Sequence, residues 1–229
     1  MSGDRRRRAK AEAQAEIDAA SRELERGTIG DVEWSRRVTD ALAAAYLFDD
    51  DPRWQSGFDG DAELWRQARE LVLDGVDRDG TFLDVGCATG HLMECLAAWA
   101  RERGRRVELY GLELSPDLAR VARRRLPAWA NRIFEGNAVD WEPPIRFTYV
   151  RTGLEYVPNG REPFLVRRLL RDVVEPGGRL IVGPVYGPAF EAAVATVTAA
   201  GFAEPAVRNA TDRNGKTRYV VVVDRQPAP

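Results

Sequence analysis

A turn of small residues between a strand-like and a helix-like segment is the clearest place for chemistry in the chain. The segment from Thr81 to Leu96 reads TFLDVGCATGHLMECL. Its apolar run ends at Val85, small residues follow, and apolar residues then recur at helical spacing. Small residues let backbone approach a bound molecule, and a helix start offers unpaired N–H groups. The pattern predicts a strand, a turn and a helix that bind a cofactor, with the Asp84 carboxylate beside the opening.

The spacing of the turn argues against two common nucleotide sites. A dinucleotide fingerprint needs glycine at its first, third and sixth positions, whereas here Gly86 is followed by Ala88 and His91. Gly215-Lys216-Thr217 resembles the end of a P-loop, but Ala210 stands where the earlier glycine is required. That segment also leads into a predicted strand instead of a helix, so neither NAD nor a P-loop nucleotide is indicated.

Four segments together resemble the class I S-adenosylmethionine-dependent methyltransferases. Asp84 to Gly90 resembles the glycine-rich first motif of that family. Glu113 ends the second predicted strand, where the family keeps an acid that accepts hydrogen bonds from the ribose hydroxyls. Gly136-Asn137-Ala138 resembles the segment that contacts adenine, and Leu170 to Gly183 resembles the family's helix, turn and fifth strand. The resemblance covers Thr81 to Asp224.

The resemblance implies S-adenosyl-L-methionine as the cofactor and assigns to it the residues that follow the first three strands. These are Asp84, Gly86, Cys87, Ala88, Thr89, Gly90, His91, Glu113, Leu114, Asn137 and Ala138. Two of them depart from the family pattern, since Asn137 stands where an aspartate is more usual and Ala88 where a glycine is often seen. An amide both donates to and accepts from a purine edge, so Asn137 suits adenine. His91, the only histidine, is expected near the cofactor as a helix-start residue instead of acting as a general base.

Candidate catalytic residues follow the fourth predicted strand, because ligands of open α/β sheets bind beyond the carboxyl ends of the strands. Glu155 is a candidate to take a proton, Tyr156 to orient a hydroxyl, and Arg151 to pair with an anionic substrate group. Each is equally open to a local structural role, and Tyr186 follows the fifth strand in a similar place. Methyl transfer is an in-line displacement for which a strong base is optional. The family's Asn/Asp-Pro-Pro-Tyr signature is absent from this stretch, which argues against methylation of amino groups on nucleobases.

Alternating strand and helix patterns from Thr81 onward predict an α/β fold. The expected architecture is a Rossmann-like three-layer sandwich whose seven-stranded, mostly parallel sheet ends in an antiparallel strand pair, with N-terminal helices as a cap. Asn214-Gly215 is the hairpin signal for that pair. The later strands are predicted at 107–114, 131–135, 145–150, 179–185, 203–208 and 217–223. Helices are predicted at 31–48, 61–75, 115–126, 163–174 and 188–200, with Asp61 and Ser115 as caps.

Three domains are expected along the chain. Residues 1–30 form a charged N-terminal helix or tail, 31–78 a helical cap, and 79–229 the methyltransferase domain. The arginine run at Arg5 to Arg8 reads as a solvated surface, although it is also a candidate docking arm for a partner.

The loop from Asp49 to Gly60 combines a run of three consecutive aspartates with two aromatic residues. Adjacent aspartates lack the alternating ligand spacing of a calcium loop, so solvation is the preferred interpretation of Asp49-Asp50-Asp51. Trp54 and Phe58 either cover a ligand or plug the edge of the core. With two cysteines and one histidine, the chain offers no metal site.

Composition favours a small-molecule methyl acceptor. The 229-residue chain has a formal net charge of −2, so it has no basic field to hold nucleic acid. No apolar run approaches the roughly 20 residues that span a bilayer, no secretory leader is evident, and two reduced thiols suit a cytoplasmic protein. A macromolecule methyltransferase and a non-catalytic cofactor-binding module remain as alternatives, and a homodimer is left open.

Overall fold

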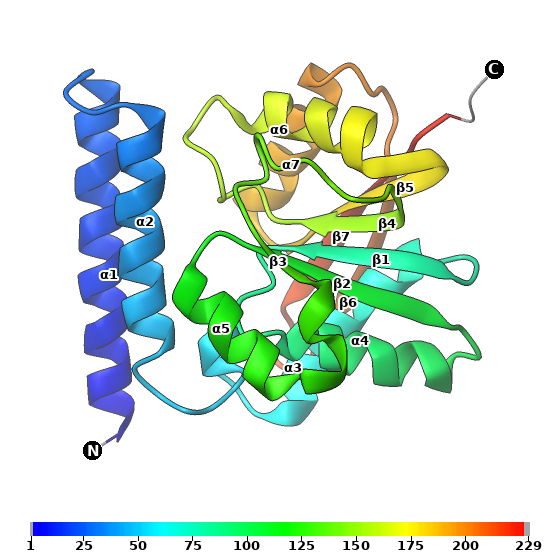
Figure 1. Ribbon diagram of the computed structural model, residues 1–229, viewed down its shortest axis with the longest axis horizontal. Helices are drawn as coiled ribbons and strands as arrows, with labels where there is room; N and C mark the ends of the chain where they lie inside the picture. The colour runs from blue at the N-terminus through cyan, green and yellow to red at the C-terminus, as the bar shows by residue number, and fades with distance from the viewer. Residues whose placement is uncertain (1, 227–229) are drawn as a thin grey trace.

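Seven strands form one sheet in the order β3-β2-β1-β4-β5-β7-β6 (Figure 1). The computed structural model describes residues 2–226. The first five strands run parallel, while β7 is antiparallel to both β5 and β6. This confirms the predicted α/β class and the antiparallel closing pair.

The strands are β1 (Gly80–Val85), β2 (Val107–Glu113), β3 (Ile133–Glu135), β4 (Phe147–Thr152), β5 (Val174–Val185), β6 (Ala206–Thr211) and β7 (Thr217–Asp224). The α-helices are α1 (Ser2–Glu25), α2 (Asp31–Tyr46), α3 (Ala62–Arg69), α4 (His91–Glu102), α5 (Pro116–Arg125), α6 (Glu162–Arg168) and α7 (Pro188–Ala199). Short turns of other helix types are η1 (Trp54–Ser56), η2 (Glu70–Gly75), η3 (Pro127–Arg132) and η4 (Leu169–Val173). The predicted caps are confirmed, since Asp61 and Ser115 accept hydrogen bonds from the N–H groups of Leu64 and Leu118 at 2.9 and 3.4 Å.

Several predicted boundaries were wrong for reasons of pairing and backbone geometry. β4 starts and ends later than 145–150 because its first and last residues, Phe147 and Thr152, pair with β5. Its register with β1 places Arg151 opposite Asp84 inside the strand. β6 starts at Ala206 instead of 203, since Glu204 has a φ of 54° and a proline follows it. The helices predicted at 61–75 and 163–174 each end in a differently wound turn, η2 and η4.

Two apolar clusters cover the two faces of the sheet and produce the three layers. Neighbouring residues of β1 point to opposite faces, so Phe82 joins one cluster and Leu83 the other. Leu96 of α4 packs with the first cluster, and Leu165 of α6 and Val197 of α7 pack with the second. Alternation along the strands therefore places helices on both faces.

Helices α1 and α2 form an antiparallel hairpin beside the sheet (Figure 1). Trp34 and Val38 of α2 pack with Ala20 of α1 in a small core of their own. The indole nitrogen of Trp34 donates to the Ser21 hydroxyl at 3.0 Å, and Arg37 bonds to Glu16 and Glu23 of α1. The charged N-terminal segment is thus a packed helix and not only a solvated one.

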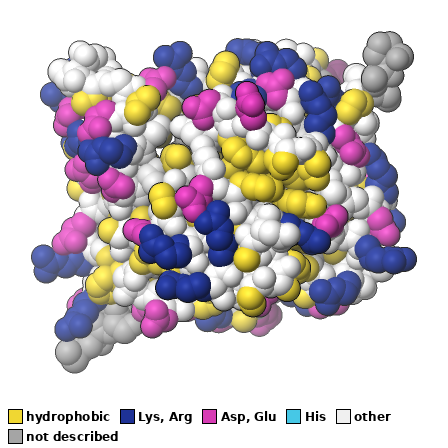
Figure 2. Space-filling view, viewed as in Figure 1, with side chains coloured by type: hydrophobic (Ala, Val, Ile, Leu, Met, Phe, Trp, Pro, Cys, Tyr) yellow, Lys and Arg dark blue, Asp and Glu magenta, His cyan; other side chains and the backbone are white. Residues whose placement is uncertain are grey.

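Charged residues of both signs alternate over the face in Figure 2. The solvated interpretation of the arginine and aspartate runs was wrong for Asp49, whose carboxylate accepts two hydrogen bonds from Arg6 at 2.8 and 2.6 Å. Arg7 pairs with Asp4 and Arg8 with Glu12. Between residues 2 and 226, no helix has the length and apolar character needed to cross a membrane.

Candidate functional site

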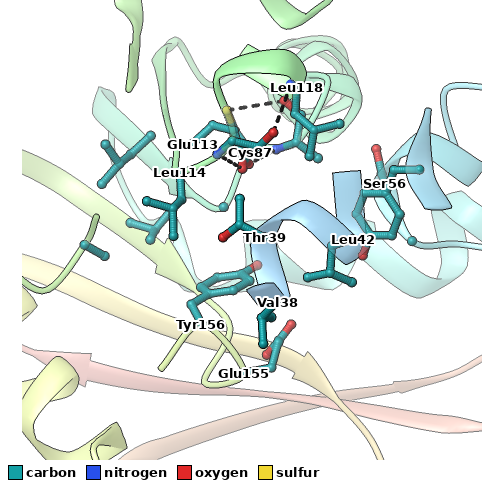
Figure 3. A pocket seen from close by; sticks show the side chains of 18 of the residues that line it. Val38, Thr39, Leu42, Ser56, Cys87, Glu113, Leu114, Leu118, Glu155 and Tyr156 are labelled. Carbon is teal, nitrogen blue, oxygen red and sulfur yellow. Dashed lines mark hydrogen bonds between the residues drawn. The ribbon is translucent and has the colours of Figure 1, made fainter. Parts of the chain in front are cut away.

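A cavity of about 470 Å³ lies between the α1–α2 hairpin and the carboxyl ends of β1, β2 and β4. Figure 3 shows Val38, Thr39 and Leu42 of α2 facing it, with Glu113 and Leu114 on one side and Glu155 and Tyr156 on the other. Its volume is in the range of small-molecule sites. No group of three or more His, Cys, Asp or Glu side chains placed to hold a metal ion occurs in the described part of the chain.

The turn after β1 brings backbone to the cavity. The N–H groups of Gly86 and Cys87 both donate to the Leu112 carbonyl, at 2.8 and 3.1 Å, which ties the turn to β2. Gly86 has a φ of 72°, and a Cβ there would lie 2.4 Å from Cζ of Tyr156. Only glycine therefore fits between the turn and the Tyr156 ring.

Ala88 adopts the left-handed conformation in this turn, with a φ of 49°. We expect Ala88→Gly to stabilise the fold by about 1 kcal/mol. An L residue in this backbone region costs roughly 1–2 kcal/mol, and glycine removes that strain. The greater conformational entropy of glycine in the unfolded chain offsets part of the gain. Urea unfolding measures the change. Ala138→Gly, at a cavity position without a positive φ, is the control and should destabilise. Equal losses of unfolding free energy in the two variants would contradict the claim that the backbone of Ala88 is strained.

Glu113 fastens the turn and faces the cavity. Its two carboxylate oxygens accept hydrogen bonds from the N–H groups of Ala88 and Ser115, at 2.8 and 2.9 Å. Burial raises the pKa of Glu113, while these backbone donors oppose the rise. Each carboxylate oxygen has a second lone pair, so the group is able to accept two further hydrogen bonds from a ligand.

The segment after β3 forms the neighbouring wall. The Asn137 side-chain oxygen accepts from the Val139 N–H at 3.2 Å, and Gly136 N–H donates to the Glu113 carbonyl at 3.0 Å. The Asn137 amide nitrogen has no hydrogen-bond partner within residues 2–226, so it is available to donate. Leu114 and Ala138 add apolar surface beside it.

Arg151 links three strands at the floor of the cavity. Its guanidinium contacts Asp84 Oδ1 at 3.1 Å, the Gly183 carbonyl at 2.7 Å and the Tyr156 hydroxyl at 3.3 Å. Burial raises the pKa of Asp84, although the Arg151 cation limits the rise. Much of the Arg151 hydrogen-bonding capacity is thus used within the protein, and its proposed contact with a substrate anion stays a prediction.

Most of the predicted site residues line this one cavity. They are Asp84, Gly86, Cys87, Ala88, Glu113, Leu114, Asn137, Ala138, Arg151, Glu155 and Tyr156. Thr89, Gly90 and His91 lie outside the lining, although Leu92 in the first turn of α4 belongs to it. Tyr186 also lies elsewhere, half exposed beneath the Lys216 ammonium.

The structure decides between the two interpretations of the aromatic loop. Trp54 is 1% exposed and donates from its indole nitrogen to the Ala45 carbonyl at 2.8 Å. Phe58 packs edge-on against Trp65, with ring centroids 5.3 Å apart. Both rings plug the core, and the loop reaches the cavity through Ser56 and Gly57 instead.

Sequence reasoning missed several lining residues, of which Tyr46, Thr39 and Arg69 are the polar ones most relevant to a ligand. Burial raises the pKa of Tyr46 to about 12, so its hydroxyl keeps its proton at neutral pH. Arg69 could have been identified from the sequence, because it is a charged residue within the apolar stripe of α3, four residues after Trp65. Nothing in the sequence identifies Tyr46 and Thr39 as lining residues beyond their place on a half-buried helix.

His91 lies just behind the cavity wall. Its ring stacks on Trp65 with centroids 4.9 Å apart, and Nδ1 is 2.9 Å from Nη2 of Arg125. Burial and the Arg125 cation lower the pKa of His91, while Glu94 opposes the change. The imidazole is therefore neutral at pH 7.

This lowered pKa predicts a loss of stability in mild acid. Below the unfolded pKa of about 6.5 the unfolded chain binds a proton that native His91 does not, so stability is full above that pH and falls as the pH drops towards the folded pKa. Urea unfolding at pH 7.5 and 5.5 tests this, and His91→Gln should reduce the difference. An NMR titration of the single imidazole is the direct check, and a pKa at or above 6.5 would contradict it.

Solved structures of other proteins share the fold of this chain. The chain matches 1,6-didemethyltoxoflavin-N1-methyltransferase from Burkholderia thailandensis, solved with 1,6-didemethyltoxoflavin and S-adenosylhomocysteine bound, with a TM-score of 0.60 at 16% identity over 86% of this chain and 91% of that one. It matches the cyclase SpnF with a TM-score of 0.59 at 17% identity over 85% and 97% of the two chains. The chain has the Rossmann-like fold of the class I S-adenosylmethionine-dependent methyltransferases, as its sequence predicted.

Part of the chain is also similar in sequence to curated methyltransferases. Trans-aconitate 2-methyltransferase from Rhodopseudomonas palustris (strain HaA2) is 30% identical over 118 residues, which cover 50% of this chain and 43% of that protein. The chain spans less than half the length of the curated relatives it matches. No protein-family profile matches it.

Proposed function

We propose that the protein transfers a methyl group from S-adenosyl-L-methionine to a small metabolite. The observation that carries this proposal is a single cavity that joins the Glu113 carboxylate and the glycine turn to a compartment closed by α1 and α2. The fold alone is insufficient support, since one structure of the same fold is a cyclase.

The residues on the β1–β3 side fit the proposed cofactor. Glu113 offers free lone pairs to ribose hydroxyls, and Asn137 offers a free amide donor to the adenine edge between Leu114 and Ala138. The absence of a Cβ at Gly86 lets the turn lie against the Tyr156 ring, and both line the cavity. When bound, the cofactor supplies an electrophilic methyl group on a sulfonium.

The residues on the β4 side then have to position an acceptor and exclude water. Arg151 donates to the Tyr156 hydroxyl, which leaves that hydroxyl's own proton to point at an acceptor. Glu155 is the candidate to take a proton from an oxygen or nitrogen acceptor. Tyr46 and Thr39 close the compartment from the α2 side.

Two observations favour a small acceptor over a macromolecule. Gln14 and Ile17 of α1 line the cavity, so the N-terminal helix covers the site where a macromolecule would have to enter. Arg6, Arg7 and Arg8 already have carboxylate partners within the chain, which weakens their case as a docking arm. The relatives named for trans-aconitate, a small organic acid, point the same way.

Radiolabelled methyl transfer tests the proposal. The protein is incubated with methyl-labelled S-adenosylmethionine and a cell extract divided into small-molecule, protein and RNA fractions. We expect label in the small-molecule fraction, and none with Glu113→Ala. Label in protein or RNA would favour a macromolecular acceptor, and cofactor binding without transfer to any fraction would favour a non-catalytic module.

A further inference from the structure

Arg69 is a cation at the cavity without a carboxylate partner in the described part of the chain. It ends α3 and lines the cavity, and its one hydrogen bond is a 3.5 Å contact with the adjacent Ala68 carbonyl. The two other arginines near it are paired, Arg151 with Asp84 and Arg218 with Asp212. A partly buried guanidinium without a counter-ion is costly unless a ligand supplies one.

Aromatic rings fix the place of this guanidinium. Its central carbon lies 5.4 Å from the centre of the Phe58 ring and 5.1 Å from that of Trp65. Trp65 is held in turn by His91, on which it stacks, and by Cys95, whose sulfur accepts from the indole nitrogen at 3.3 Å. Cation–π contacts use the face of the guanidinium and leave its N–H donors free for an anion.

Arg69 belongs to the acceptor half of the cavity. The turn between β6 and β7 anchors α3, since the Arg213 N–H donates to Gln67 at 2.9 Å and the Arg213 side chain pairs with Glu63 at 2.9 Å. That turn lies beyond β4 and β5 in the sheet, whereas Glu113 and Asn137 follow β2 and β3 on the other side of β1. The free cation therefore lies on the opposite side from the residues proposed for the ribose and adenine.

We infer that Arg69 binds a carboxylate of the methyl acceptor, which makes the substrate class an organic acid. This inference rests on the proposed function and specifies its substrate. A planar guanidinium suits the two oxygens of a carboxylate and would orient the acid while the methyl group is transferred elsewhere on it or to its second oxygen. Burial and the neighbouring Arg151 and Arg218 cations lower the pKa of Arg69 to about 10, while Tyr156 and Glu155 oppose the change. Arg69 therefore remains charged at neutral pH, and an anion bound directly to it would relieve the repulsion between the cations.

Calorimetry with acids and their neutral esters tests this specificity. The probes are trans-aconitate, succinate and benzoate, each beside its fully esterified methyl ester, titrated into protein saturated with S-adenosylhomocysteine. We expect the wild-type protein to bind at least one acid more tightly than its ester, and Arg69→Gln to bind that acid roughly tenfold or more weakly. Arg69→Lys keeps the charge without the planar pair of donors and should be intermediate.

Arg106→Gln makes the same charge change at an exposed site and should bind the acids as the wild type does. Ester binding should be equal in all variants, which also shows that Arg69→Gln is folded. If no acid is preferred over its ester, or if Arg69→Gln and Arg106→Gln behave alike, the inference is overturned.

A second arm separates acceptor from cofactor. S-adenosylhomocysteine has an amino-acid carboxylate and 5′-methylthioadenosine lacks one. We expect Arg69→Gln to bind both as the wild type does. Selective loss of S-adenosylhomocysteine would assign Arg69 to the cofactor and overturn the inference, while leaving the proposed function intact. Failure of the wild-type protein to bind either nucleoside would instead refute the proposed function.

Discussion

Glu113→Ala is expected to weaken S-adenosylhomocysteine binding by roughly 100-fold. The loss follows from two ribose hydrogen bonds to a charged acceptor, which together contribute about 3 kcal/mol. The same carboxylate also accepts from the N–H groups of Ala88 and Ser115, so the variant leaves two backbone donors unpaired and loosens the turn. Isothermal titration calorimetry measures the affinity.

Glu135→Ala is the matched control for this variant. Glu135 pairs with Glu113 in the β2–β3 register and likewise ends its strand, but it does not line the cavity and pairs with Arg123. Its removal should leave the affinity unchanged. Equal affinities for Glu113→Ala and the wild type would show that Glu113 has no part in a nucleoside site.

The features that sequence predicts well here are those decided by neighbours along the chain. Ser115-Pro116 marks a helix start by local chemistry, and the structure confirms it. The small residues after Val85 were found from the local strand-turn pattern, and Glu113 was found because it ends a predicted strand where the resembled family keeps an acid. Alternation and turn signals gave the sheet and its closing hairpin in the same way.

The features that sequence misses depend on contacts between distant segments. β4 extends to Thr152 because that residue pairs with Val182 of β5, and no local signal marks it. Arg69 joins the cavity because the β6–β7 turn, more than 140 residues later, anchors α3. The sequence allowed Trp54 either to cover a ligand or to plug the core. The hydrogen bond from its indole nitrogen to the Ala45 carbonyl, which only the structure reveals, decides for the core.

The same contacts explain how a charged pair comes to lie under the cavity. Asp84 is the last residue but one of β1 and was expected beside the opening, yet its carboxylate is buried against Arg151. Arg151 in turn bonds to Gly183 of β5 and to Tyr156. One cross-strand network thereby connects Asp84, which is proposed for the cofactor side, with Arg151 and Tyr156, which are proposed for the acceptor side. In-line transfer would require such a fixed arrangement.

Gly86→Ala should damage both the fold and the site, because the added methyl would meet the Tyr156 ring at 2.4 Å. Gly104→Ala provides the control, since Gly104 has nearly the same φ, 70° against 72°, but no atom within 4 Å of the added methyl. We expect a loss of about 1 kcal/mol in free energy of unfolding for Gly104→Ala, from backbone strain alone, and about 3 kcal/mol for Gly86→Ala, from strain plus overlap. Urea unfolding compares the two.

The overlap should also be visible in binding. A Tyr156 ring pushed from Gly86 must move towards the cavity, so Gly86→Ala is expected to weaken S-adenosylhomocysteine binding roughly 100-fold while Gly104→Ala leaves it unchanged. Removing the ring in the Gly86→Ala, Tyr156→Ala double variant should restore most of the affinity relative to Gly86→Ala. Equal losses of stability in the two glycine variants, or no recovery in the double variant, would mean that the space between the turn and Tyr156 does not set the shape of the site.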